Sequence, residues 1–562
     1  MIQDARTIPA GQILSADICI IGGGPAGISI AKELAGITAR VIQIEAGDWK
    51  ETAAARDLYR GFVEPESSHE PLEENRRRQW GGATAAWGGR CIPFDAIDFE
   101  KRDWVPHSGW PITKTDLDPY FARALQLCEA GEYKFRADEA LPGTQREIIT
   151  GFDGADVVSH PLERWGPPTH FGKRYAKDLQ SAANVTVLFN ANCLHIQLDP
   201  GAKQVTQIKV ASFARNEFFV KARFFVVACG GLENARLLLA SNDVMKTGIG
   251  NHSDKLGRYY MAHLFGAVAY AKLRDNTKGF IYEFERDREQ VYCRRRFWIT
   301  PEAQQRERML NGITFFFRPP LSRGAVHRNA LFSTVYLAKF FLTTFKRNNP
   351  VRALAVLKEH RSALLSHFKI ALADAPGLVP QVIGIIKNRY FAKRRLPFIL
   401  PSKKHNHYSL YYQTEHAPNP ESRVMLHSEK DCFGMPRLLV KIAFTDLDVQ
   451  TVLQTHRLIK QQFQTSCTGQ LDYDEVALAE DVQHEIKDFN SSAHQIGTTR
   501  MSANPADGVV DANCKVHGIA NLFLAGSSVF PTSGHANPTL TLVALAVRLA
   551  DHLKSEVKKP AA

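Results

Sequence analysis

Hydrophobic residues near the start of the chain form a short continuous run at Asp17–Ile21, followed by glycines and then by apolar positions at helical spacing over Ile28–Leu34. A second continuous run, Arg40–Ile44, ends in Glu45. Continuous apolar runs of this length are typical of parallel strands that are buried on both faces. The pattern therefore predicts a strand–helix–strand unit that is complete within about 30 residues.

The turn between the first strand and the helix reads Gly22-Gly23-Gly24-Pro25-Ala26-Gly27, which matches the GxGxxG pattern. Gly22 allows a tight turn, Gly24 lets the backbone approach a pyrophosphate, and Gly27 lets the helix pack closely on the strand. The free N–H groups of the helix N-terminus favour the phosphate charge. Glu45 is placed to bind the adenosine ribose hydroxyls and would repel a 2′-phosphate, so NADP is disfavoured, whereas this motif does not separate FAD from NAD.

Three further segments place small residues next to predicted strands. The loop Trp80–Gly89 is dense in glycine and can press its backbone against a planar ring system. The strand Arg223–Val227 ends in glycines and precedes a helical stretch, Leu232–Ser241, whereas the strand Asn521–Leu524 leads into a loop rich in Pro, Ser and Gly. Besides Gly22, Gly24, Pro25, Ala26, Gly27 and Glu45, the predicted cofactor contacts are Trp80, Gly81, Gly82, Thr84, Cys193, Gly230, Gly526 and Ser527.

The C-terminal segment Asn537-Pro538-Thr539 precedes a long apolar stretch, Leu540–Leu553, which predicts a helix. Asn is a favoured N-cap and Pro a favoured first helical residue, so Asn537 fits a plain helix cap. A helix start aimed at a cofactor ring would in addition stabilise negative charge on that ring. Asn537, Pro538 and Thr539 are therefore also predicted cofactor contacts.

These motifs together resemble the glucose–methanol–choline (GMC) oxidoreductase family. The resemblance is closest to its sugar-oxidising branch, similar to pyranose oxidase and bacterial sugar or glycoside dehydrogenases. The most specific match is an HxxGT segment followed by a GxANPT segment. The segments that carry the resemblance are Gly22–Gly27, Gly81-Gly82, Val226–Ser241, Glu415–Arg423, His494–Thr498 and Gly534–Thr539.

The resemblance implies roles for three residues near the C-terminus. In the sugar-oxidising branch a histidine is the catalytic base and an asparagine is its partner, which places these roles on His494 and Asn537. His535 lies two residues before Asn537 and is an alternative partner. The histidine that attaches FAD covalently in pyranose oxidase corresponds to Ala86, so non-covalent FAD is expected here.

The predicted reaction follows from the chemistry of alcohol oxidation. A proton must leave oxygen and a hydride must leave carbon; flavin N5 can accept the hydride, and a neutral imidazole suits the proton. We therefore predict an FAD-dependent oxidoreductase that acts on a CH–OH group of a sugar, glycoside or related polyol, as a dehydrogenase in preference to an oxidase. The external electron acceptor stays open. A flavin-bound lyase of the hydroxynitrile lyase type, found on the same fold, is the alternative function.

The predicted fold class is α/β, a GMC-like arrangement of two discontinuous domains. A Rossmann-like FAD-binding domain is expected from residues 14–130, 165–265 and 490–562. A substrate domain is expected from residues 131–164 and 266–489. Its antiparallel sheet is predicted to include strands at Asn406–Gln413 and Leu438–Phe444.

Residues 325–400 predict a helical and basic insertion in the substrate domain. Apolar residues recur at helical spacing, and basic residues such as Lys393, Arg394 and Arg395 gather nearby. One interpretation is a helical lid that packs on the substrate domain. The other is an interfacial helical patch that makes peripheral contact with a membrane or a lipid-linked substrate.

Composition bears on three further questions: whether the chain is disordered, which partners it has, and where in the cell it is located. Of the 562 residues 44% are hydrophobic and 23% charged, which excludes disorder as the dominant state. The net charge of +12 is not accompanied by zinc-ligand spacing, an RNP-type motif or a long basic run, so neither a nucleic-acid partner nor a metal site is predicted. Nine cysteines without a CxxC pair, and no apolar segment over Met1–Leu14, predict a cytoplasmic location, peripheral at the inner membrane surface in the second interpretation of residues 325–400.

Overall fold

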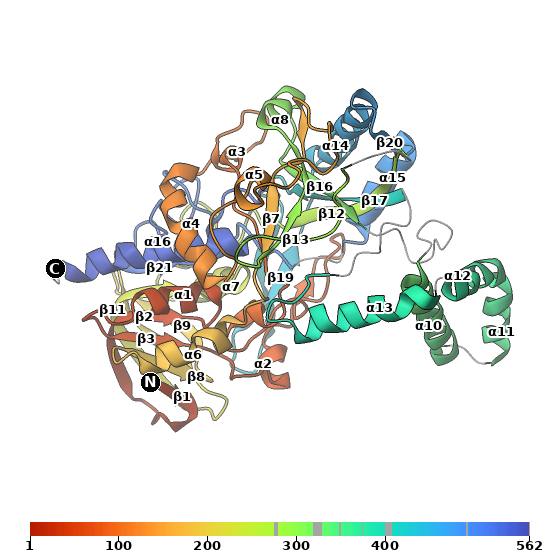
Figure 1. Ribbon diagram of the computed structural model, residues 1–562. Helices are drawn as coiled ribbons and strands as arrows, with labels where there is room; N and C mark the ends of the chain where they lie inside the picture. Colours follow the sequence, from red (N-terminus) through yellow and green to blue (C-terminus); the bar gives the residue numbers. More distant parts are fainter. Residues whose placement is uncertain are drawn as a thin grey trace.

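The computed structural model describes residues 1–274, 279–317, 329–347, 350–373, 375–398, 407–489 and 493–560. Its body contains two large sheets, and an arm of helices extends from the body to the right in Figure 1. We define the arm as residues 329–398. The N-terminus lies beside the first sheet, and the C-terminus ends the long helix packed near it (Figure 1).

The first sheet has eight strands, collected from the beginning, the middle and the end of the chain. The four predicted strands are present and lie next to one another, with parallel pairing between β2 and β3, β2 and β11, and β11 and β21. The FAD-binding domain was predicted to start at residue 14, but its sheet already includes β1, which lies before that residue. In spatial order the strands are β1 (Ile2–Asp4), β8 (Val185–Phe189), β3 (Val41–Ile44), β2 (Ile13–Ile21), β11 (Glu217–Val227), β10 (Val205–Ala211) and β9 (Asn192–Leu198), with β21 (Leu522–Leu524) also on β11.

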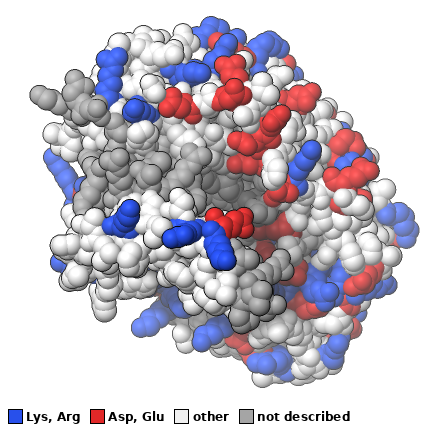
Figure 2. All heavy atoms as spheres, turned by 90° about the vertical axis from the view of Figure 1, so that its right-hand side faces the viewer, with Lys and Arg blue, Asp and Glu red and all other residues white. Residues whose placement is uncertain are grey.

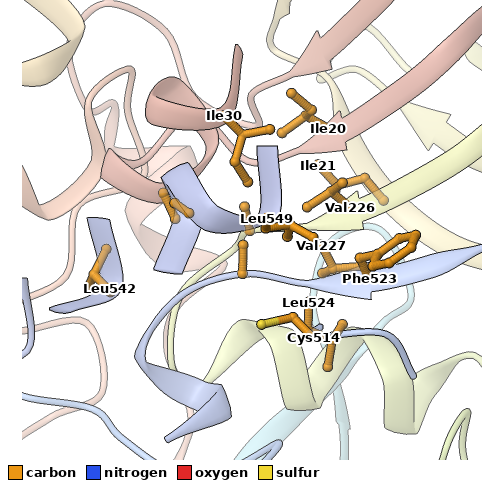
Figure 3. Close-up of a cluster of buried hydrophobic side chains, with 14 of the residues drawn as sticks. Ile20, Ile21, Ile30, Val226, Val227, Cys514, Phe523, Leu524, Leu542 and Leu549 are labelled. Atoms are coloured by element: carbon orange, nitrogen blue, oxygen red, sulfur yellow. The ribbon is translucent and has the colours of Figure 1, made fainter. Parts of the chain in front are cut away.

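The largest core lies between this sheet and its helices, because the central strands are apolar on both faces. Figure 3 shows side chains of β2, β11 and β21 around Leu549 of the long C-terminal helix, with Ile30 of the first helix beside them. The predicted helices are confirmed, although each differs from its prediction by a few residues at its ends. The helices of this layer are α1 (Pro25–Glu33), α4 (Lys114–Leu127), α6 (Phe171–Ser181), α7 (Glu233–Ala240) and α16 (Thr539–Lys558).

The second sheet has six strands, each antiparallel to its neighbours. The predicted strand at 406–413 is present as β17, although Asn406 itself lies outside the described residues. Helices α14 (Asp446–Thr465) and α15 (Glu475–Lys487) pack against this sheet. In spatial order the strands are β20 (Gly469–Asp472), β12 (His263–Leu273), β17 (His407–Glu415), β16 (Gly312–Phe317), β15 (Phe297–Ile299) and β6 (Val157–Val158).

The strand predicted at 438–444 belongs to a different sheet, which corrects the prediction. It forms β19 (Pro436–Lys441), which pairs with β18 (Arg423–Lys430) and with β4 (Phe62–Val63). Leu438 and Val440 pack in a separate core, because β19 lies between the neighbouring strand β18 and β4 from the N-terminal part of the chain.

A small four-stranded sheet joins the two halves of the body. It contains β13 (Glu285–Arg286), β14 (Tyr292–Arg295), β7 (Leu162–Trp165) and β5 (Arg90–Cys91). Strand β5 follows the second glycine-rich loop directly, so this sheet brings residues of the substrate side next to that loop.

The arm consists of helices that pack mainly on one another, not over the six-stranded sheet. The predicted helical character is confirmed, but the interpretation as a lid packed on the substrate domain is not supported by these contacts. The helices are α10 (Ala330–Arg347), α11 (Pro350–Glu359), α12 (Arg361–Ala373) and α13 (Ala375–Ile386), followed by the π-helical turn η3 (Lys387–Phe391). Residues 325–328, 348–349, 374 and 399–400 of the predicted insertion lie outside the described residues.

Within the described residues, no single helix has both the length and the apolar composition needed to cross a membrane; the pair 361–373 and 375–391, bent by 81°, meets both requirements only when taken together.

Candidate active site

A cavity opens at the carboxyl ends of β2, β3, β11 and β21, where the glycine-rich loops of the chain converge. Parallel strands expose their carboxyl ends at one edge of a sheet, which is the usual place for a nucleotide in such folds. Thirteen of the predicted cofactor contacts line this cavity. They are Gly22, Gly24, Pro25, Ala26, Glu45, Gly82, Thr84, Cys193, Gly230, Gly526, Ser527, Pro538 and Thr539.

Glycines form the cradle because their missing side chains leave the backbone facing open space. A Cβ atom placed on Gly24, Gly230 or Gly526 would meet no atom within 4 Å. At Gly22 the reason is different: its φ is +118°, and a Cβ would lie 2.4 Å from the carbonyl oxygen of Ala228. The fingerprint thus supplies both an open approach for a ligand and the tight turn that creates it.

Four predicted contacts, Gly27, Trp80, Gly81 and Asn537, do not line the cavity, and the first three support the cradle from behind. A Cβ on Gly27 would lie 2.1 Å from the Gly22 oxygen, so this position serves close packing. Trp80 is fully buried and its Nε1 donates to the Gly172 oxygen at 2.8 Å. The Gly81 N–H donates to the Gly23 oxygen at 2.8 Å, which ties the second glycine-rich loop to the first.

Glu45 ends β3 at the cavity wall, as predicted. Its carboxylate accepts hydrogen bonds from the backbone N–H groups of Gly23 and Gly47, each at 2.7 Å. Burial raises the pKa of Glu45, whereas these two donors act in the opposite direction. The carboxylate is therefore held rigidly beside the fingerprint loop.

A positively charged wall of the cavity was missed by the sequence analysis. Arg76 and Arg78 donate to Glu233 at 2.9 and 2.7 Å, and both guanidinium groups lie over the ring of Tyr59. Burial raises the pKa of Glu233, but the neighbouring guanidinium groups of Arg236, Arg78 and Arg76 outweigh it and bring this pKa down to about 2. The run of three arginines just before Trp80 was the signal that could have indicated this wall.

His494 and Asn537, both from the C-terminal part of the chain, contact each other beside the cavity. His494 lines the cavity, and its Nε2 lies 3.0 Å from the Asn537 side-chain nitrogen. The Asn537 oxygen accepts from Arg90 at 3.2 Å and from Gln413 at 3.3 Å. Since a guanidinium group only donates, the orientation of the Asn537 amide can be assigned: its N–H faces His494.

This orientation fixes the tautomer of His494. Because Nε2 accepts from Asn537, the ring proton is assigned to Nδ1, which lies 2.9 Å from Nδ1 of His263 and donates to it. The Nε2 lone pair of His494 is thus held on the side of Asn537, in the state required of a base.

His263, the first residue of β12, was also missed by the sequence analysis. It is fully buried, and its ring stands at 90° to that of His494 with ring centroids 4.8 Å apart. Burial, followed by the nearby His494 and His535, holds the pKa of His263 well below its usual range. A single histidine within a strand has no sequence signal that separates it from an ordinary core residue.

His494 is neutral near pH 7. Burial and the positive charge of Arg90 lower its pKa from 6.5 to about 4. Its lone pair is therefore free of a proton across the physiological range.

Two other histidines lie away from this pair. His535 is fully buried and its Nε2 lies 2.9 Å from Asp95, which draws the ring away from His494 and the cavity. The structure thus does not support His535 as the side-chain partner of His494. His416 is also buried, between the Ala262 N–H and the Ala443 oxygen, in a structural position.

The interpretation of Asn537 as a plain helix cap is wrong. Helix α16 begins at Thr539 after Pro538, without any side-chain capping hydrogen bond. Arg90 and Gln413 instead hold the Asn537 side chain toward His494. The first turn of α16 nevertheless faces the cavity through Pro538, Thr539 and Leu542.

Comparison with known proteins places the chain in a family. The model of the FAD dependent oxidoreductases matches residues 17–327, and that of the GMC oxidoreductase C-terminal region matches residues 418–546. The chain belongs to the FAD-dependent oxidoreductases. Its C-terminal part is a GMC oxidoreductase domain, as the sequence motifs predicted.

The sequence similarity to known relatives covers nearly the whole length of this FAD-dependent oxidoreductase. It is 21% identical to the fructose dehydrogenase large subunit of Gluconobacter japonicus, over 98% of this chain and 100% of that protein. It is 24% identical to paromamine 6′-oxidase of Streptomyces fradiae, over 95% of this chain and 90% of that protein. The solved structure of formate oxidase aligns with 98% of this chain and 99% of its own at a TM-score of 0.54 and 18% identity, which shows a shared fold.

The cavity fits FAD, the cofactor of this family. Open glycine backbones at Gly24, Gly230 and Gly526 leave room for close approach, and the N-terminus of α1 directs N–H groups toward it. Glu45 stands at the end of β3, where a ribose hydroxyl is bound in such sites.

Proposed function

We propose that this FAD-dependent oxidoreductase oxidises a CH–OH group of a sugar, glycoside or related polyol, with His494 as the base for the hydroxyl proton. The supporting observation is that His494 lines the cofactor cavity and that its unprotonated Nε2 accepts a hydrogen bond from the Asn537 side chain. The names of its relatives, which include a sugar dehydrogenase and an aminoglycoside oxidase, agree with this substrate class.

The proton step follows from this geometry. A substrate hydroxyl that displaces the hydrogen bond between the two side chains can donate to His494 Nε2 while its oxygen accepts from Asn537. The amide N–H, held by Arg90 and Gln413, then stabilises the charge that develops on the oxygen as the proton leaves. FAD, when bound, supplies the ring that accepts the hydride from carbon.

His263 is proposed to act as a positioning residue for His494. Replacing His263 by Phe removes the acceptor for the Nδ1 proton and frees the ring to rotate or to change tautomer, at a cost of ~1 kcal/mol for one hydrogen bond. We expect kcat to fall about fivefold with little change in KM, because the substrate contacts remain. His263→Asn, whose side-chain oxygen can replace Nδ1, should recover most of the loss. Equal activity of His263→Phe and the wild type in flavin reduction would contradict this role.

The pH dependence of kcat/KM tests the state of His494. The base works only when neutral, so activity should stay level from neutral pH to about pH 5 and fall with a midpoint near the pKa of about 4. Arg90→Met removes a positive charge that disfavours the imidazolium, and should therefore move the midpoint upward. Rapid pH-jump measurements limit exposure of the enzyme to acid. A wild-type midpoint near 6.5 would contradict the buried, neutral base.

Substrate class and reaction type can be tested together under anaerobic conditions. A panel of sugars, glycosides and simple alcohols is added to the yellow enzyme, and the flavin absorption is followed. Bleaching by a member of the panel supports oxidation. A substrate that is cleaved while the flavin stays oxidised would instead support the lyase alternative.

We further propose that FAD is bound non-covalently and that the enzyme is a dehydrogenase. Ala86, at the position that carries the attached histidine in pyranose oxidase, has no group able to bond to the cofactor. Acid precipitation should therefore leave the flavin in the supernatant. Reoxidation of the reduced enzyme should be faster with a soluble quinone than with oxygen, whereas the reverse order would make it an oxidase.

A further inference from the structure

The arm exposes most of the large apolar side chains on the described surface. Among the described residues, seventeen large hydrophobic side chains are exposed, and thirteen of them belong to the arm. Four-fifths of Phe391 and about 70% of Leu342 and Tyr390 are accessible to solvent. Large apolar side chains that gather on one exposed part of a molecule indicate a contact with another molecule or with a membrane. The thirteen are Val335, Phe341, Leu342, Phe345, Leu354, Leu365, Phe368, Leu372, Val379, Ile383, Ile386, Tyr390 and Phe391.

Helix α13 shows the feature most clearly. It has no buried residue along its length, and Gln381 is its only polar side chain. Val379, Ile383 and Ile386 form an exposed stripe at helical spacing. The helix passes directly into the basic and aromatic run 387–395, the order of residues typical of an anchor at a membrane–water interface.

The rest of the arm is held together without covering these side chains. His367 of α12 stacks on Tyr336 of α10 at 4.0 Å and bonds to Ser333, while Asn329 donates to Gln381 of α13. These contacts point inward, between the helices. The outward positions of α10 and α12, such as Leu342 and Phe368, remain exposed.

The arm also carries most of the excess positive charge of the chain. Residues 329–398 contain twelve Lys and Arg against two Asp and Glu, a net charge of +10, whereas the whole chain has +12. Nine basic residues of the arm have described side chains, and none of these nine forms an ion pair with a carboxylate: Lys339, Lys358, Arg361, Lys369, Lys387, Arg389, Lys393, Arg394 and Arg395. In Figure 2, which faces the side of the arm, blue side chains stand among uncharged surface at the front, and red side chains gather mainly to the right.

We propose that the arm docks onto the surface of an anionic lipid bilayer. Exposed apolar side chains can enter the boundary between headgroups and acyl chains, while exposed basic side chains such as Lys369, Lys387 and Lys393 meet the lipid phosphates. A second copy of the chain fits this surface less well, because two surfaces of +10 repel each other. The proposal is independent of the catalytic assignment, since it concerns residues outside the cavity.

The root of the arm connects this docking surface to the catalytic half of the molecule. Phe398, where the arm returns to the body, packs on Trp165 and lies under the Arg294 guanidinium. Arg294 pairs with Glu163, which also pairs with Arg90, the residue that orients Asn537. These contacts therefore attach the docking surface to the catalytic half of the enzyme.

Vesicle co-sedimentation of the holoenzyme tests the proposal. The probes are vesicles of phosphatidylcholine with phosphatidylglycerol, compared with phosphatidylcholine alone, at low and high salt. We expect binding to the anionic vesicles that weakens with salt. The double variant Val379→Gln/Ile383→Gln, which removes apolar surface without changing the charge, should bind at least tenfold more weakly.

Val476→Gln is the matched control, because Val476 is 69% exposed but lies on α15 of the body. It should bind vesicles like the wild type, and both variants should keep the flavin spectrum and the circular dichroism of the wild type. The proposal is overturned if the wild type does not bind anionic vesicles at low salt, or if the α13 variant binds equally well. It is also overturned if light scattering shows a dimer that the α13 variant disrupts, with no vesicle binding by the wild type.

Discussion

His494→Ala is expected to give a folded, yellow enzyme whose flavin is no longer reduced by substrate at a measurable fraction of the normal rate. Among the described residues that contact the Asn537 side chain, His494 alone can accept the hydroxyl proton at neutral pH, since its pKa is about 4 and its Nε2 carries the lone pair. A positioned base contributes about 10²–10⁴-fold to such a reaction. The loss should appear in the rate of anaerobic flavin bleaching, measured by rapid mixing.

The control for this variant is His252→Ala, because His252 is exposed and lies outside the cavity. It should leave the bleaching rate unchanged. If His494→Ala bleaches as fast as this control, His494 has no part in the mechanism and another base must be sought.

Gly24→Val is expected to give a folded but colourless protein. The backbone of Gly24 has φ −80° and ψ −176°, which valine adopts without strain, and a Cβ there meets no protein atom within 4 Å. The new side chain therefore leaves the fold intact and fills the space that the pyrophosphate requires. Affinity for FAD should fall at least about 100-fold, which corresponds to ~2.8 kcal/mol.

Gly384→Val is the matched control, because a Cβ at Gly384 also meets nothing within 4 Å but lies in the arm. Titration of the apoproteins with FAD, followed by flavin fluorescence, compares the two. A yellow Gly24→Val protein with normal affinity would show that the cofactor does not occupy the cavity beside the fingerprint.

The cofactor cavity was largely predictable because its residues are contiguous in sequence and each has a local reason for its type. Gly22 and Gly24 lie in one turn between a strand and a helix, and thirteen of the predicted contacts do line the cavity. Trp80 and Gly81 were predicted as contacts but support the loop from behind. The pattern of small residues indicates a tight loop, but it does not say which face of that loop meets the ligand.

The catalytic site was predictable only in its two central residues. His494 and Asn537 were found through the family resemblance, whereas Arg90, Gln413 and His263 were not. These three come from three different strands, and their proximity depends on how the sheets pack. Long-range pairing of this kind leaves no periodic signal in a single sequence. The same reason explains why the strand predicted at 438–444 was assigned to the wrong sheet.

The arm shows the opposite situation. Its helical spacing and basic charge were visible in the sequence, but a lid on the substrate domain and a membrane-facing patch predict the same spacing. Only the exposure of α13 and the outward side chains of α10 and α12 distinguishes between them.

The most direct test of the catalytic proposal is a crystal structure of the enzyme with FAD and an unreactive substrate analogue. We predict that one hydroxyl oxygen of the analogue lies within hydrogen-bond distance of both His494 Nε2 and the Asn537 side-chain nitrogen, and that the carbon bearing this hydroxyl faces flavin N5. A structure in which the flavin lies elsewhere, or in which these two side chains point away from the bound hydroxyl, would contradict it.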